Sequence, residues 1–242
     1  MNNGHQLLIK MMYRDTHNVP TLVGGMLEDK GTYRFKEIYF SWLFETPEEW
    51  SFNEVNFPAE LHIVFYHTKY GDLENALNAD EGIAVLCIGF RVRRHNTPSA
   101  FLRIVDTSLS RVLQATSNTT VPKNGSVSFS DFLPKDLKYF YGYTGTMLAT
   151  DTPWPTTCKA KVIWIDVEES LQIHPDQVLE LRKLRNFHGK SHFPHAIEYS
   201  RPTIPVYRSL DPNGKDIEYD NGQQPTANVW CLIVIFFLYL AV

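Results

Sequence analysis

The sequence predicts a mainly β protein of the α+β class, with one domain and a few surface helices. Of its 242 residues, 43% are hydrophobic and 13% are aromatic, which is typical of a globular chain with a core of ordinary size. Strand-like apolar runs recur along the chain, whereas only two segments show a helical period. The strand-like runs occupy residues 6–12, 33–44, 61–66, 83–92 and 159–167.

The two predicted helices cover residues 99–114 and 175–184. In the first, apolar side chains recur at spacings of three and four residues, which indicates an amphipathic helix. The second begins with Pro175 at the first helical position and Asp176 in the first turn, both favourable there. The predicted buried stripes are Leu102, Val105, Leu109 and Val112 in the first helix and Val178, Leu181 and Leu184 in the second.

His62 stands in the middle of an apolar strand. The segment 59–66 reads AELHIVFY, and strand side chains alternate between the two faces of a sheet. His62 therefore shares one face with Val64 and Tyr66. The strand alone leaves two alternatives, a core histidine satisfied by protein partners or a metal ligand.

The sequence on either side of His62 resembles that of a known family. The segments FPAELHIV (57–64), HTKYGDLENAL (67–77) and DEGIAVLCIGFRV (80–92) are similar to the core of the α-class carbonic anhydrases. The resemblance runs almost continuously over residues 2–208. It implies a fold around a central, twisted, largely antiparallel sheet.

The resemblance also implies three zinc-binding histidines, of which this chain has one. His62 lies at one ligand position, and Tyr39 and Ser41 replace the other two. A neutral phenol and a serine hydroxyl are poor zinc donors beside imidazole. We therefore expect no cofactor and no hydration of carbon dioxide. The alternative is a zinc-dependent carbonic anhydrase that uses altered ligands.

Other catalytic positions of the family are also altered or ambiguous. His5 matches a proton-shuttling histidine, and Glu49 matches a glutamate that orients a threonine. Each can equally be an ordinary surface side chain. The threonine itself aligns with Leu148, in a segment with six extra residues before Cys158. The sequence thus predicts a second defect in the catalytic machinery.

The remaining features exclude some partners. The 23 basic and 27 acidic residues give a net charge of −4, which does not suggest a nucleic-acid partner. His188, His192 and His195 lie in a segment rich in Gly and Pro, and we interpret them as surface residues. The expected role is binding of an unknown protein partner outside the cell.

The start of the chain matches an internal motif of the family, NNGH at residues 2–5. The sequence therefore predicts a carbonic-anhydrase-like domain over residues 1–208 that lacks its N-terminal portion, and the chain shows no signal peptide. In secreted relatives, Cys158 would pair with a cysteine near the N-terminus. Sequons at Asn118 and Asn124 predict glycosylation sites and mildly support secretion.

The C-terminal part divides into a polar linker, residues 209–228, and an apolar tail, residues 229–242. Three alternatives remain for the tail: a cleaved lipid-anchor signal, a tail-anchored helix or a buried strand. A polar spacer followed by 14 apolar residues favours the anchor signal, with attachment at Asn221. We therefore expect a location on the extracellular face of the plasma membrane.

Overall fold

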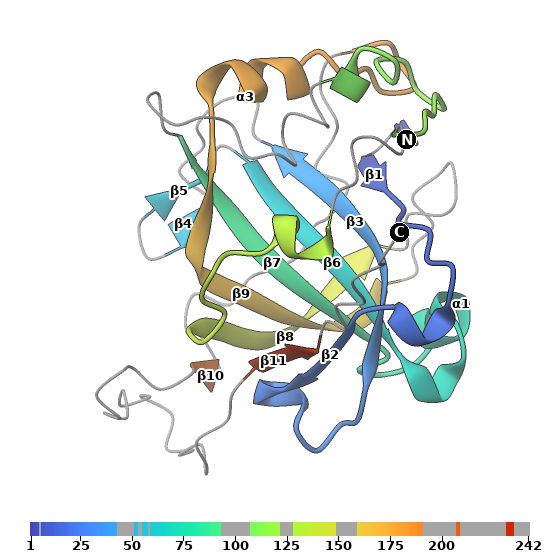
Figure 1. Cartoon of the computed structure of the whole chain (residues 1–242), viewed down its shortest axis with the longest axis vertical. Helices are drawn as coiled ribbons and strands as arrows, with labels where there is room; N and C mark the ends of the chain where they lie inside the picture. The colour runs from blue at the N-terminus through green and yellow to red at the C-terminus, as the bar shows by residue number, and fades with distance from the viewer. Residues whose placement is uncertain are drawn as a thin grey trace, which may run out of the picture.

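The fold is a large twisted sheet with few helices, as predicted. The computed structural model describes residues 1–4, 6–42, 51–52, 55–57, 59–92, 107–121, 128–148, 159–190, 207–208 and 231–234. Nine strands form the main sheet in the order β10-β8-β9-β7-β6-β3-β2-β11, with β1 paired to β3 (Figure 1). Among the described strands, only β7 and β9 pair in parallel, so the predicted largely antiparallel sheet is confirmed.

The strands of this sheet are β1 (Leu7–Ile9), β2 (Thr21–Gly24), β3 (Tyr33–Trp42), β6 (Ala59–His67), β7 (Ile83–Val92), β8 (Phe140–Leu148), β9 (Lys159–Ile173), β10 (Tyr207–Arg208) and β11 (Cys231–Val234). A separate hairpin pairs β4 (Ser51–Phe52) with β5 (Val55–Asn56). The α-helices are α1 (Leu73–Leu77) and α3 (Pro175–Leu181), and the 3-10 helices are η1 (Thr16–Asn18), η2 (Gly25–Leu27), η3 (Thr68–Tyr70) and η5 (Phe129–Phe132).

All five predicted strands are present, but β2, β4, β5, β8 and β10 were not predicted, and β8 is the longest of them. Its sequence, FYGYTGTML, contains two glycines, which resemble turn signals when they are read along one chain. In the sheet they permit close packing instead. A Cβ at Gly142 would lie 1.9 Å from Met26 Sδ, and one at Gly145 would lie 2.8 Å from Trp164 Cδ1. Glycine at these two positions therefore leaves room for side chains that are distant in sequence.

The two faces of the sheet bury separate apolar clusters. Leu61, Ile63 and Phe65 pack in the larger cluster, together with residues of α3 and η5. Val64 and Tyr66 belong to the other cluster, on the face that also holds His62, Tyr39, Cys87 and Trp164. We call this second surface the His62 face. The alternation predicted for residues 59–66 is therefore confirmed.

The helix predicted over residues 175–184 is α3, which ends at Leu181. The His174 side chain accepts from the backbone N–H of Asp176, and the Gln177 side chain accepts from that of His174, so both ends of a capping box are made. Leu184 is fully buried just beyond the helix. For the other predicted helix, residues 99–106 lie outside the described residues. The helical conformation ends at Leu109 and turns follow, so the predicted end at residue 114 is wrong, although Leu109 and Val112 are buried as expected.

The first residues of the chain connect two distant segments. Asn2 is fully buried, and its side-chain amide donates to the carbonyls of Val112 at 3.1 Å and Arg185 at 3.0 Å. Its Oδ1 accepts from the backbone N–H of Gly4. The NNG motif therefore links the segment 107–121 to the residues that follow α3 (Figure 1).

Part of the apolar tail is a strand in this structure. Cys231–Val234 form β11, which pairs antiparallel with β2 from Cys231 opposite Gly24 to Val234 opposite Thr21. Those four residues are therefore a strand, as one of the three alternatives for the tail expected. Within the described ranges, no helix is long and apolar enough to cross a membrane.

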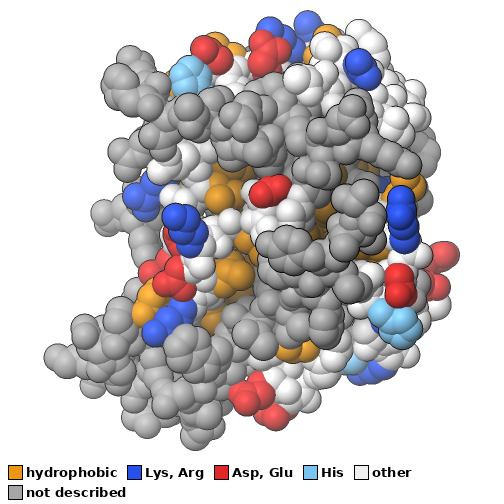
Figure 2. Space-filling model, viewed as in Figure 1, with side chains coloured by type: hydrophobic (Ala, Val, Ile, Leu, Met, Phe, Trp, Pro, Cys, Tyr) orange, Lys and Arg blue, Asp and Glu red, His pale blue; other side chains and the backbone are white. Residues whose placement is uncertain are grey.

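On the face shown in Figure 2, the described basic and acidic side chains are intermixed. Figure 2 shows Lys and Arg interspersed with Asp and Glu around its margins, with hydrophobic atoms visible between them.

Candidate functional site

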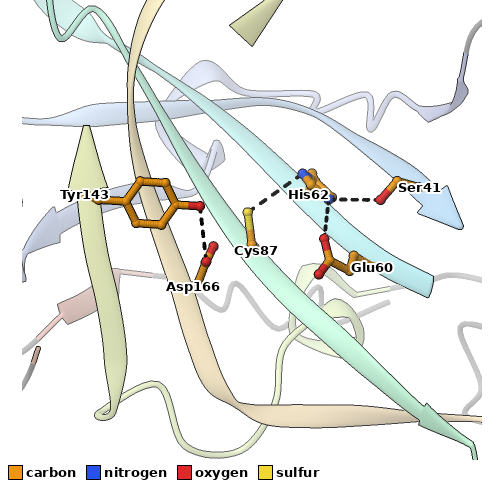
Figure 3. A network of polar contacts seen from close by, with 6 residues as sticks. All are labelled: Ser41, Glu60, His62, Cys87, Tyr143 and Asp166. Carbon is orange, nitrogen blue, oxygen red and sulfur yellow. Dashed lines mark hydrogen bonds and ion pairs between the residues drawn. The ribbon is translucent and has the colours of Figure 1, made fainter. Parts of the chain in front are cut away.

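A row of polar side chains crosses the His62 face. It spans five neighbouring strands in sheet order β8-β9-β7-β6-β3 (Figure 3). We call it the polar row, and its members are Tyr143 on β8, Asp166 on β9, Cys87 on β7, His62 and Glu60 on β6, and Ser41 on β3. Polar groups this deep in a sheet are stable only when they have partners.

Cross-strand register places the residues of the row. Tyr39 of β3 and Cys87 of β7 both lie directly opposite His62. Ser41 is two residues beyond Tyr39 and lies opposite Glu60, which is two residues before His62. Because a shift of two residues returns to the same face, these side chains project together from three adjacent strands.

Aromatic rings hold the imidazole of His62 in place. The side chain has no exposed surface. The Tyr39 ring stacks on it with centroids 4.6 Å apart and planes inclined by 27°. Trp164 contacts it edge-on at 5.9 Å and 87°. The ring is thus enclosed on a face and an edge, and only its in-plane nitrogens are left for polar contacts.

Both imidazole nitrogens have protein neighbours. His62 Nε2 lies 3.1 Å from Ser41 Oγ and 3.2 Å from Glu60 Oε2, and Nδ1 lies 3.7 Å from Cys87 Sγ. An ionised carboxylate can only accept hydrogen bonds. With Glu60 ionised, Nε2 carries the proton of the neutral ring, and Nδ1 presents its lone pair to the Cys87 thiol.

The row continues beyond Cys87. Asp166 lies opposite Cys87 in the parallel pairing of β7 with β9. The hydroxyl of Tyr143 donates to Asp166 Oδ2 at 3.2 Å, and both residues are buried. Carboxylates therefore flank the Cys87–His62 pair on two sides, Glu60 on β6 and Asp166 on β9.

We compared these side chains with what zinc requires. Catalytic zinc sites use three protein ligands from imidazole, thiolate or carboxylate groups, and structural sites use four. Within the described part of the chain, no three His, Cys, Asp or Glu side chains are grouped so that they could hold a metal ion. Tyr39 contributes a ring stacked on the imidazole, and Ser41 contributes a hydroxyl hydrogen-bonded to it. The described donor set around His62 falls short of a zinc site.

Several predicted positions lie outside the described residues: His5, Glu49, Asn124, Asn221, Cys158, His192 and His195. Among the described positions, Asn118 and His188 are both exposed, and Leu148 ends β8. Of the predicted site residues that the structure describes, Tyr39, Ser41 and His62 lie together.

Sequence reasoning missed the contributions of Glu60, Cys87, Asp166 and Tyr143. One signal was available for Glu60, because it precedes His62 by two residues and so shares its face. Cys87 stands in the apolar run AVLCIGF, where a cysteine is most simply a small buried hydrophobe, and it is indeed buried with 3% exposure. Its contact with His62 depends on the register between β6 and β7, which a single sequence does not reveal.

Comparisons with known proteins agree with this architecture. The family model of the eukaryotic-type carbonic anhydrases matches residues 1–214. Carbonic anhydrase 6 of Bos taurus is 27% identical over 184 residues, which cover 74% of this chain and 52% of the relative. The chain thus spans about half the length of that curated relative. With a family model matching most of its length, the chain belongs to the eukaryotic-type carbonic anhydrase family.

Proposed function

We propose that this protein is a non-catalytic member of its family, which binds no zinc at His62, does not hydrate carbon dioxide and acts by binding a protein partner outside the cell. One observation carries the proposal: the two positions that the resemblance assigns to zinc ligands hold Tyr39 and Ser41, and these contact His62 as a stacked ring and a hydroxyl.

The chemistry of these groups supports the proposal. In a zinc enzyme of this kind, the metal lowers the pKa of its bound water to about 7 and so supplies hydroxide at neutral pH. That role needs three donors that hold the ion and leave one position open. Around His62, the Glu60 carboxylate and the Ser41 hydroxyl are on one ring nitrogen, and the Cys87 thiol is on the other. Both nitrogens of the His62 ring therefore have protein partners.

The first prediction concerns metal content and activity. Protein purified without chelators and dialysed against micromolar zinc is expected to retain well below one zinc per chain and to show no hydration of carbon dioxide above the buffer rate. Elemental analysis and stopped-flow measurement of proton release test this. One tightly held zinc per chain with measurable hydration would instead establish the alternative, an enzyme with altered ligands.

Extracellular location is part of the same proposal. Asn118 begins one of the two glycosylation sequons and is exposed, as an acceptor site must be. The polar linker and apolar tail add a lipid-anchor signal with attachment at Asn221. Attachment there would remove residues 222–242, and with them β11. In this proposal β11 belongs to the uncleaved chain, and β2 becomes an edge strand in the anchored form.

The second prediction tests the anchor. When the chain is expressed in mammalian cells behind a secretory leader, we expect surface protein that phosphatidylinositol-specific phospholipase C releases, without the peptide containing Cys231–Val234. Asn221→Gln should strongly reduce the released protein, because the attachment site requires a small residue. Asn213→Gln, in the same linker, is the matched control. Mature protein that retains residues 231–234 in its mass spectrum would contradict the anchor.

A further inference from the structure

We propose that removal of the apolar tail opens a strand-docking edge on β2, and that this edge binds an extended apolar segment of the protein partner by antiparallel pairing. The inference deepens the proposed function and rests on it, because β2 is released from β11 only by cleavage at Asn221. It names a surface for the partner and the chemistry of the segment that the partner presents.

β2 lies next to the end of the main sheet. Among the described strands, it pairs with β3 on one side and with β11 on the other, and β11 is the last strand in that direction (Figure 1). Once residues 222–242 are removed, one side of β2 therefore has no described strand beside it. A row of unpaired N–H and C=O groups along a strand is a template for another strand.

Alternation along β2 identifies the backbone groups that face this edge. The carbonyl of Pro20 accepts from the backbone N–H of Phe35 at 2.8 Å, so residue 20 faces β3. In an antiparallel pair, the N–H and C=O of one residue point to the same side, and successive residues point to opposite sides. Leu22 therefore also faces β3, whereas Thr21 and Val23 direct their N–H and C=O groups toward β11.

The sequence of β2 does not block this edge. Natural edge strands are commonly protected by lysine, by proline or by bulges. The strand reads TLVG, with no charged residue and no proline. Pro20 directly precedes it, but residue 20 faces β3, so its missing N–H is on the other side. The length of four residues restricts the partner to a short segment.

The uncleaved chain shows what this edge accepts. β11 lies on it with Leu232 opposite Val23 and Val234 opposite Thr21. The sequence of β11 is CLIV, which is uncharged and apolar. Leu22 is fully buried in the larger cluster, so the position opposite it requires an apolar side chain. We therefore expect a partner segment that is extended, uncharged and as short as β11.

Cleavage also removes a competitor. While residues 231–234 remain attached through the polar linker, they rebind β2 within the same molecule at an effective concentration of about 1 mM. A segment of another protein must then displace them. The uncleaved chain is therefore closed to the partner, and attachment of the lipid anchor is the step that exposes the docking edge.

The experiment measures peptide binding to the protein that phosphatidylinositol-specific phospholipase C releases from cells. The probe is a fluorescent peptide of residues 229–236 with Cys231→Ser and added terminal lysines, and its anisotropy reports binding. We expect it to bind the released protein. It should bind at least ~10-fold more weakly to the uncleaved Asn221→Gln chain, in which the tethered β11 competes for the same edge.

Two methylated peptides test the mode of binding without any protein variant. The backbone N–H of Leu232 faces β2, and that of Ile233 points away from it. Methylation of the Leu232 nitrogen should weaken binding at least ~10-fold, because a hydrogen bond is lost and the methyl group prevents close approach. The same methylation at Ile233 is the matched control. On the protein side, Val23→Pro should weaken binding equally, and Val23→Thr, which keeps the N–H, should not.

Three results would overturn the strand-docking edge. They are no binding of the peptide to the released protein, equal affinity of the two methylated peptides, and a released protein that light scattering shows to be a dimer unless it carries Val23→Pro. The last would show that a second copy occupies the edge. The mass spectrum of the same sample separates the two proposals. Retention of residues 231–234 would refute the anchor and the docking edge together, whereas a cleaved protein that binds no peptide would refute only the docking edge.

Discussion

The double variant Tyr39→His with Ser41→His is expected to convert the polar row into a zinc site. Both positions lie on β3, on the face of His62, and Tyr39 is its direct cross-strand neighbour. The variant would present three imidazoles from two adjacent strands, which is enough for a zinc ion with one open position. We expect the apparent zinc Kd to fall at least ~1000-fold, or about 4 kcal/mol, measured by competition with a fluorescent chelator.

Matched variants isolate the cause of that gain. Tyr39→Phe with Ser41→Ala removes the same two hydroxyls without adding a donor and should gain no zinc. Adding His62→Ala to the histidine pair should abolish the gain. We expect no hydration of carbon dioxide in this variant, because the resemblance aligns the orienting threonine with Leu148. A cooperatively folded double variant that gains no zinc affinity would show that the ligand positions were misassigned.

Trp164→Ala is expected to cause the largest loss of stability among single changes on the His62 face. Trp164 is fully buried on β9, between its neighbours β7 and β8. It contacts His62 edge-on, and its indole occupies the space beside Gly145. Truncating a buried Trp costs about 3–5 kcal/mol, a large share of the 5–15 kcal/mol that typically holds a domain together.

Urea unfolding followed by circular dichroism measures this loss. Leu179→Ala is the control, because Leu179 lies on α3 with 53% of its surface exposed and its truncation should change the free energy of unfolding by less than ~0.5 kcal/mol. A loss below ~1 kcal/mol for Trp164→Ala would mean that the aromatic packing around His62 contributes little to the free energy of unfolding. It would also argue against the claim that these aromatic rings fix the orientation of the imidazole.

Local patterns were sufficient for much of the fold. Alternation in residues 59–66 correctly assigned Leu61 and Val64 to opposite faces, because the period of a strand is a property of its own backbone. Pro175 correctly marked the start of α3. The strand β8 was missed, since Gly142 and Gly145 meet requirements set by Met26 and Trp164, which are distant in sequence.

The sequence by itself determined the family and the mainly β fold, and its resemblance to that family predicts that Tyr39 and Ser41 replace two zinc ligands. Only the tertiary structure decided which groups surround His62. Cross-strand register places Ser41 and Glu60 on one side of the His62 ring and Cys87 on the other. Hydrogen bonds act over about 3 Å in space, and no spacing along one chain specifies which strands will lie that close.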